Sequence, residues 1–187
     1  MTAVYPVHYS VEPVAGFSRL QLLVRFAAFV ALGLVGLSFG AVFLFAYVAL
    51  PVLAAVRPES RGVALQALRW FAAISAWTGL TTDRIPQQRT DETIHLEVDR
   101  EPPMTTPRSA ILRIFTGFPS ALVLGVLCFI GAFVWLWAAL SILFSERVGS
   151  TARKYLIGLQ RWSVRLLAYQ GSFVDDYPPF TLEEVHS

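Results

Sequence analysis

The sequence predicts a mainly α-helical integral membrane protein with two long transmembrane helices, amphipathic interfacial helices and a short strand segment before each of two repeats. Composition gives the class: of 187 residues, 55% are hydrophobic and 15% are charged. This is too apolar for an ordinary soluble domain. The net charge of +2 comes from scattered basic residues, so we expect membrane lipids as partners and no nucleic acid.

Two long uncharged stretches predict the transmembrane helices. Residues 26–56 and 114–145 contain no Asp, Glu, Lys or Arg. A hydrocarbon core of about 30 Å needs roughly 20 apolar residues, and two spans joined by a turn need about 40, so each stretch predicts one span. Proline is tolerated at the first position of a helix, which places the second span at about 119–145. By the same spacing the first span covers about 31–56. We expect that it is not removed as a signal peptide, because some 18 mixed residues precede the first apolar run.

The two halves of the chain repeat one another. At an offset of 92, identical residues recur in order: Arg61 and Arg153, Trp70 and Trp162, Gly79 and Gly171, Asp83 and Asp175, Pro86 and Pro178. Upstream, Arg25 corresponds to Arg113 at an offset of 88, so about four residues were gained or lost within the spans. We therefore predict two tandem cassettes.

Each cassette is expected to contain a strand, a short amphipathic helix, a span, a second helix and a proline turn. The first cassette covers 1–88, with the span at about 31–56, the second helix at 61–82 and a degenerate proline turn. The second covers 89–187, with the span at about 119–145, an interfacial helix at 152–174 and a tail containing Tyr-Pro-Pro-Phe. The alternating segments "VHYSV" and "IHLEV" open the two cassettes as strands.

The helix predicted at 152–174 has a polar stripe on an apolar surface. Lys154, Arg161, Arg165 and Ser172 follow one another at spacings of seven, four and seven. This pattern is typical of a helix that lies on a membrane, with its arginines reaching lipid phosphates. Alternatively, Arg161 and Arg165 bind an acidic segment or a lipid headgroup specifically.

The sequence contains little that could carry chemistry. The histidines at 8, 95 and 186 lie outside both spans, so no cofactor is expected in the bilayer. His8 and His95 occupy equivalent strand positions, but two imidazoles without a third ligand are weak evidence for a metal. Neither span contains a charged residue that could relay protons or bind ions. We expect no catalytic, cofactor or metal site, and hence a protein that is not an enzyme.

Small residues in the spans predict close helix packing. Gly33, Gly36 and Gly40 mark one face in the first span, and Gly125 and Gly131 mark another in the second. Small residues allow helix backbones to approach each other closely in a bilayer. The pattern does not distinguish packing within one chain from packing between chains.

The ending "DDYPPF" is unusual because aspartates after a helix oppose the helix dipole. We predict that Tyr177 and Phe180 hold the stiff Pro178–Pro179 turn against an apolar surface. The two aspartates would then accept hydrogen bonds from backbone donors or arginines. In a local version the arginine is Arg161, Arg165 or Arg147; in an inter-subunit version it belongs to a neighbour.

The segments "LQRWSVRLLAY" and "DDYPPFTLEE" resemble the bacterial domain-of-unknown-function family 4389, whose members often carry tandem copies. The first half departs from this pattern, with Ile85, Gln87 and Gln88 where the family has tyrosine, proline and phenylalanine. The resemblance supports the fold and topology only and supplies no activity, because the family has no established function. We expect a multi-pass protein of the bacterial cytoplasmic (inner) membrane. Nine residues are candidate docking or lipid contacts: Arg161, Trp162, Arg165, Tyr169, Asp175, Tyr177, Pro178, Pro179 and Phe180.

Two functions fit these observations. The first is a non-catalytic accessory or structural subunit of a larger membrane complex, which packs against other membrane protein subunits through its spans and interfacial helices. The alternative is a stand-alone lipid- or small-solute-binding module, which requires a cavity. For topology we expect one crossing per cassette, which inverts the cassettes and places their strands on opposite sides of the membrane.

Overall fold

The protein is described by a computed structural model that covers residues 5–14, 16–34, 38–86, 90–99 and 106–184. Its first half contains β1 (Val7–Val11), α1 (Arg19–Leu34), α2 (Phe39–Val56) and α3 (Arg61–Thr78). Its second half contains β2 (Ile94–Val98), α4 (Pro107–Thr116), α5 (Phe118–Ser145) and α6 (Ser150–Gln170). Short 3-10 turns at Pro58–Ser60 and Thr90–Glu92 precede α3 and β2. The fold is therefore mainly helical, and both halves have the order strand, helix, helix, helix.

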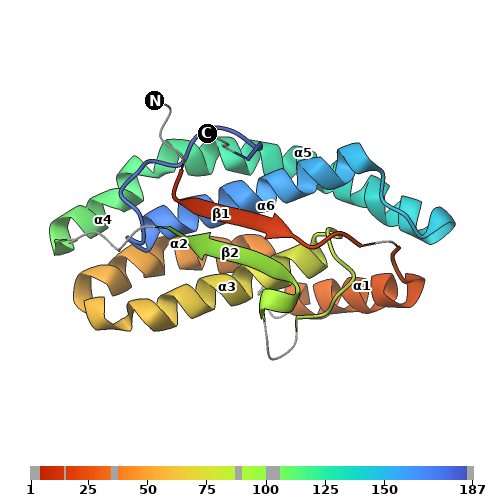
Figure 1. Cartoon of the computed structure of the whole chain (residues 1–187), viewed down its shortest axis with the longest axis horizontal. Helices are drawn as coiled ribbons and strands as arrows, with labels where there is room; N and C mark the ends of the chain where they lie inside the picture. The colour runs from red at the N-terminus through yellow and green to blue at the C-terminus, as the bar shows by residue number, and fades with distance from the viewer. Residues whose placement is uncertain (1–4, 15, 35–37, 87–89, 100–105, 185–187) are drawn as a thin grey trace.

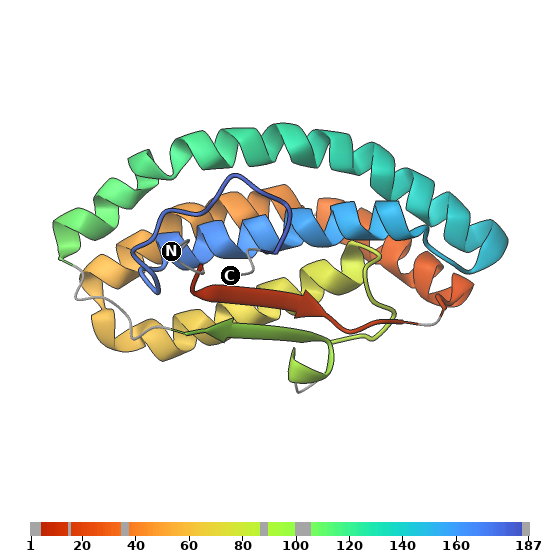
Figure 2. The same cartoon turned by 45° about the horizontal axis from the view of Figure 1, so that its top comes forward.

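The elements form three layers along one long axis (Figures 1 and 2). A ribbon of β1 and β2 covers α3 and α6, and the helices α1, α2, α4 and α5, here called the outer layer, lie on the far side. The two halves interlock, because α2 packs on α4, α1 on α5 and α3 on α6. One core cluster includes residues from both halves, among them Leu68 and Leu166.

The ribbon is antiparallel, with Tyr9 opposite Leu96 at its centre. Alternate side chains, including Val7, Tyr9 and Ile94, face the helices and are buried, which is the period-two pattern of a strand with one covered face. Both expected strands are confirmed. However, they pair directly, so the expectation that they lie on opposite sides of a membrane is wrong.

Among the described residues, α5 is the one helix long and apolar enough to cross a membrane. It follows Gly117 and has Pro119 in its first turn, as the sequence predicts. The predicted first span at about 31–56 is divided instead: α1 ends at Leu34 and α2 begins at Phe39. The Ser38 side chain caps α2 by accepting a hydrogen bond from the Ala41 amide at 3.3 Å. At 1.5 Å per residue the 18 residues of α2 extend about 27 Å, slightly less than a hydrocarbon core.

The helix expected on the membrane surface, α6, is instead the central helix of the fold. It contacts α2, α3, α4, α5 and β1, and Arg165, Leu166 and Ala168 are almost fully buried. The interfacial prediction is therefore wrong. Its polar stripe is genuine, but the arginines on it face carbonyl groups of the chain's own strand and tail rather than lipid.

Candidate functional site: paired arginine anchors, the tail and an apolar cavity

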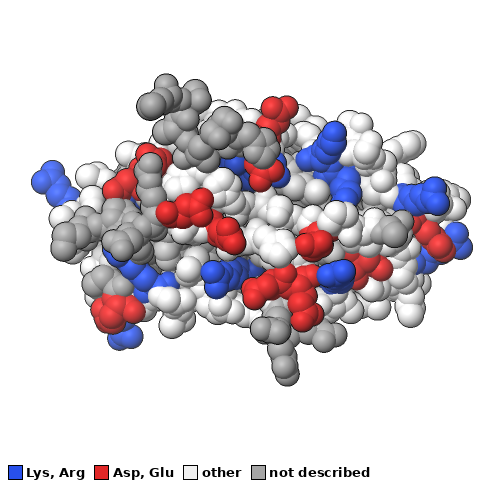
Figure 3. Space-filling view, in the orientation of Figure 1, with Lys and Arg blue, Asp and Glu red and all other residues white. Residues whose placement is uncertain are grey.

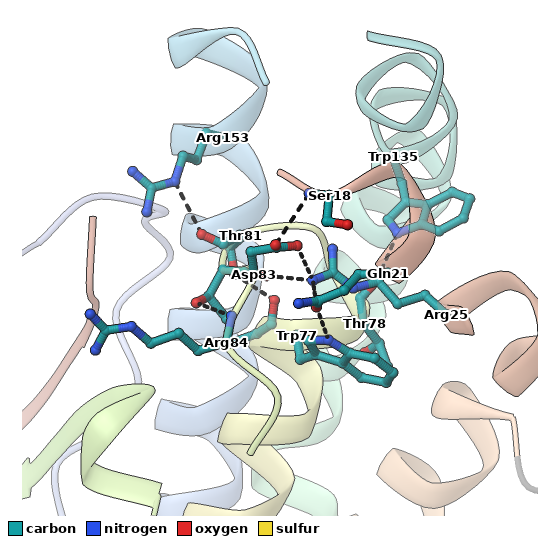
Figure 4. Close-up of polar contacts among 12 residues, drawn as sticks. Ser18, Gln21, Arg25, Trp77, Thr78, Thr81, Asp83, Arg84, Trp135 and Arg153 are labelled. Carbon is teal, nitrogen blue, oxygen red and sulfur yellow. Dashed lines mark hydrogen bonds and ion pairs between the residues drawn. The ribbon is translucent and has the colours of Figure 1, made fainter. Parts of the chain in front are cut away.

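A buried arginine anchors the end of α3 to α1. The Arg25 guanidinium donates hydrogen bonds to the Thr82 carbonyl at 2.9 Å and to the Asp83 carboxylate at 3.0 Å. It also lies 5.2 Å from the centre of the Trp77 ring, whose indole N–H donates to Gln21 (Figure 4). The Arg25 side chain is 1% exposed. A charge so far from water requires these partners.

The second half contains the same anchor at the predicted offsets. The Arg113 guanidinium donates to the Val174 carbonyl at 2.6 Å and to the Asp175 carboxylate, and it lies 4.7 Å from the centre of the Tyr169 ring. Arg25 and Arg113 are 88 positions apart in the sequence. The partners of Arg113, which are Val174, Asp175 and Tyr169, each lie 92 positions after the matching partner of Arg25.

Matching turns place both aspartates. Gly79 and Gly171 cap the C-termini of α3 and α6, and the next residues, Leu80 and Ser172, have φ of 58° and 56°. In the first turn the Thr81 amide donates a hydrogen bond to the Ala76 carbonyl. In the second turn the Phe173 amide donates one to the Ala168 carbonyl. These bonds are typical of a helix C-terminus whose chain reverses through a left-handed residue. The helices therefore end four residues earlier than expected, and each turn directs its aspartate toward an arginine.

The ribbon has the same internal symmetry. His8 approaches Asp99 at 2.9 Å, and His95 approaches Glu12 at 2.8 Å. Each member of one pair lies 87 positions from its counterpart in the other, as Tyr9 does from Leu96. Each histidine thus faces a carboxylate on the residue directly after the opposite strand. This pairing accounts for the two equivalent histidines without a metal.

The tail folds back along α6. Arg161 donates to the carbonyls of Tyr9 at 3.2 Å and Leu182 at 3.0 Å, and Arg165 donates to the Glu183 carbonyl at 3.1 Å. Gly158 allows this approach, because a Cβ there would lie 2.7 Å from the Leu182 side chain. Both arginines therefore hold the tail within the chain.

The aromatic residues of the tail pack on those of α6. The rings of Tyr177 and Tyr169 have centres 5.6 Å apart, as do those of Phe180 and Trp162, both edge to face. Pro178 and Pro179 form the turn between them. This geometry matches the local version of the tail prediction, but the arginine that pairs with Asp175 is Arg113 rather than Arg161, Arg165 or Arg147.

Burial also changes the pKa values of two tyrosines, Tyr5 and Tyr9. The Tyr9 hydroxyl donates to the Gln160 side chain at 3.1 Å, and burial raises the pKa of Tyr9 well above its ordinary value. Burial likewise raises the pKa of Tyr5, which the nearby Arg165 charge partly opposes. Both phenols are thus held neutral. Gln160 was not expected from the sequence, because a lone glutamine in an amphipathic pattern gives no signal.

Of the glycines predicted to pack helices, Gly131 does so: a Cβ there would lie 2.5 Å from Leu159. Gly33, Gly40 and Gly125 have open space at the Cβ position, and Gly36 lies outside the described residues. Close packing within the chain is therefore seen at Gly131, and packing of the three open glycines against another chain stays a prediction.

An apolar cavity of about 420 Å³ lies between α1, α3, α5 and α6. Phe26 and Phe29 line it from α1, and Ser75, Thr78 and Gly79 line it from α3. The rest of the lining comes from α5 and α6: Cys128, Gly131, Ala132, Trp135, Leu156, Leu159, Gln160 and Ser163. Two of these lining residues are joined, because the Trp135 indole N–H donates to the Thr78 carbonyl at 2.9 Å (Figure 4).

The fold and these anchors define a mainly helical protein with one candidate membrane helix in the part of the chain that the structure describes. The model of the family described as Domain of unknown function (DUF4389) matches residues 107–181, from α4 through the tail. This match covers the second half of the chain and confirms the resemblance seen there in the sequence. Comparison with curated proteins and with solved structures gives no match.

Proposed function

We propose that this chain is a non-catalytic accessory or structural subunit of a larger complex in the bacterial cytoplasmic (inner) membrane. The observation that carries the proposal is a pair of unlike faces along the same long axis. One face is the apolar outer layer, and the other is the ribbon face, formed by β1, β2 and the tail.

The outer layer exposes many large apolar side chains. On α2 and α5, Phe45 is 74% exposed, Phe133 is 63% exposed and Phe144 is 79% exposed. Such a contiguous surface is far larger than the scattered apolar residues of a soluble monomer. It fits lipid hydrocarbon or the apolar surface of neighbouring subunits.

The ribbon face is charged along its length, with acidic and basic side chains over β1, β2 and the tail (Figure 3). His95 and Glu97 on β2 are exposed, and so is Asp99 directly after the strand. If α5 crosses the bilayer in a multi-pass arrangement, this face lies at membrane depth, where an exposed charge costs at least about 2.5 kcal/mol. A protein partner over the ribbon face avoids that cost, which favours a subunit of a complex.

We also infer that the chain is a tandem duplication. Its support is the set of matching contacts at offsets of 87, 88 and 92: the two arginine anchors, the two left-handed turns and the two histidine–carboxylate pairs. The strand of each cassette pairs with the strand of the other, so the two cassettes assemble with each other. One copy alone would lack half of each interlocked layer.

The test is native purification in mild detergent through an N-terminal tag. We expect a stoichiometric larger assembly that Glu97→Lys on the ribbon face weakens. The matched control, Glu59→Lys, reverses an exposed charge in the turn before α3, away from the ribbon, and should leave the assembly intact. A monodisperse small oligomer in both wild-type and variant preparations would overturn the proposal.

One observation favours the alternative function, a stand-alone lipid- or small-solute-binding module. That function requires a cavity, and the space between α1, α3, α5 and α6 supplies one. The same purification separates the two functions, because a module of this kind would be obtained as a small oligomer with lipid bound.

A further inference from the structure

The polar side chains of Gln160, Ser75, Thr78 and Ser163, which line the cavity between α1, α3, α5 and α6, already make hydrogen bonds within the chain. The Gln160 side chain donates to the Ser75 carbonyl at 3.0 Å, and its oxygen accepts from Tyr9 and Thr81. The hydroxyls of Ser75, Thr78 and Ser163 each donate to a carbonyl of their own helix. A polar ligand would find few groups here to replace its hydrogen bonds to water, so the lining favours an apolar occupant.

The cavity opens toward the outer layer. Phe26, which is 61% exposed, borders it on α1, and the exposed Cys128 and Ala132 border it on α5. Its volume of about 420 Å³ lies within the usual range of ligand pockets. An occupant therefore enters from the side on which the protein exposes its apolar surface.

At the repeat positions that correspond to three small residues of the lining, the chain has large apolar side chains. At the offset that relates the two arginines, Gly131 corresponds to Phe43; at 92, Ser163 corresponds to Phe71 and Ser75 to Leu167. The Phe43 and Phe71 rings pack with centres 6.3 Å apart, and Leu167 is 1% exposed in the core. Three small residues thus border the cavity at positions whose counterparts in the repeat are large and apolar.

We propose that this cavity binds one acyl chain of a membrane phospholipid, whose headgroup stays outside. The inference rests on the placement of the outer layer in a membrane, and it does not require a larger complex. Hydrocarbon fits a lining whose polar atoms are already paired, and the bilayer supplies it at the mouth. No side chain in the lining is charged, so the site takes the chain and not the headgroup.

The test compares two phenylalanine substitutions on α5. Ala132→Phe fills the cavity, whereas Gly125→Phe adds the same ring where nothing lies within 4 Å of the Cβ position. Native mass spectrometry after purification in mild detergent should find one phospholipid on the wild-type chain and on Gly125→Phe. Ala132→Phe should retain about tenfold less, because excluding two or three methylene groups costs at least this factor.

Cys128 supplies a second readout, because it is the one cysteine of the sequence and it lines the cavity. Delipidation should speed its reaction with a hydrophobic maleimide several-fold, and added phosphatidylglycerol vesicles should slow it again. Equal lipid retention by both variants, labelling unaffected by lipid, or a peptide or polar solute in place of lipid would overturn the proposal. A bound phospholipid on a chain that forms no larger assembly would instead refute the accessory-subunit function and leave this inference standing.

Discussion

The two arginine anchors allow one substitution to be compared at equivalent positions. Asp83→Asn and Asp175→Asn each remove the carboxylate that faces a buried arginine. In the first half, Asp83 is 16% exposed and Arg25 is 1% exposed. The Arg25 Nε and Nη1 atoms have no hydrogen-bond partner, so the remaining charge depends strongly on Asp83. Removing one partner of a buried pair costs about 3–5 kcal/mol.

The second anchor should be less sensitive. The Asp175 side chain is 65% exposed, so water already competes with the ion pair. Arg113 also keeps its bonds to the Tyr169 and Val174 carbonyls at 2.7 and 2.6 Å. We therefore expect a cost of about 0–1 kcal/mol for Asp175→Asn.

Thermal unfolding in detergent, followed by circular dichroism, measures the difference. For a chain of this size, 1 kcal/mol lowers Tm by about 2–4 °C, so Asp83→Asn should lower it by roughly 6–20 °C and Asp175→Asn by less than about 4 °C. Arg113→Met serves as the control that the second anchor matters at all, because it also removes both carbonyl contacts. Equal shifts for the two asparagine variants would refute the assignment of Asp83 as partner of a fully buried charge.

Three further predictions concern the tail and the ribbon. Replacing Tyr177 and Phe180 together with alanine should leave membrane insertion intact and speed proteolysis of the tail; unchanged protease resistance and unchanged association would mean that the turn merely ends a helix. Gly158→Ala should cost about 1–3 kcal/mol by pushing against the tail, while Gly125→Ala, facing open space, should cost no stability in the same melt. Burial raises the pKa of Tyr9, so its stabilisation is complete below the unfolded value of about 10 and is lost as pH rises through the folded value. Tyr9→Phe should therefore flatten the loss of stability above pH 10, and an identical pH profile would contradict this assignment.

The repeat in the sequence singled out the arginines and aspartates of the two anchors, but it did not show which arginine contacts which aspartate. Arg25 and Arg113, and Asp83 and Asp175, stand out because they recur at nearly the same offset. Their contact follows from the turns at Leu80 and Ser172, which reverse the chain after α3 and α6. A left-handed leucine or serine gives no signal in a sequence, because such positions favour glycine or asparagine.

The surface placement of α6 could not have been rejected from its pattern. A stripe containing Arg161 and Arg165 satisfies lipid phosphates and backbone carbonyls equally well, since guanidinium groups bind both. The tail that supplies the carbonyls follows α6 directly, but its return path depends on Gly158 and on the packing of Phe180 against Trp162. Hydrophobic periodicity describes one helix at a time and does not report such contacts.

The proposed orientation, with the outer layer in lipid and the ribbon face away from it, is tested most directly by spin labels at one position on each face. Cysteines replace Leu136, which is 54% exposed on α5, and Ser10, which is exposed on β1, in a Cys128→Ser background. In membranes, the label at Leu136 should collide readily with oxygen dissolved in lipid and rarely with an aqueous nickel chelate. The label at Ser10 should show low oxygen accessibility. If the chelate reached the Leu136 label as readily as it reaches a label in water, the outer layer would not lie in the membrane and the account would be wrong.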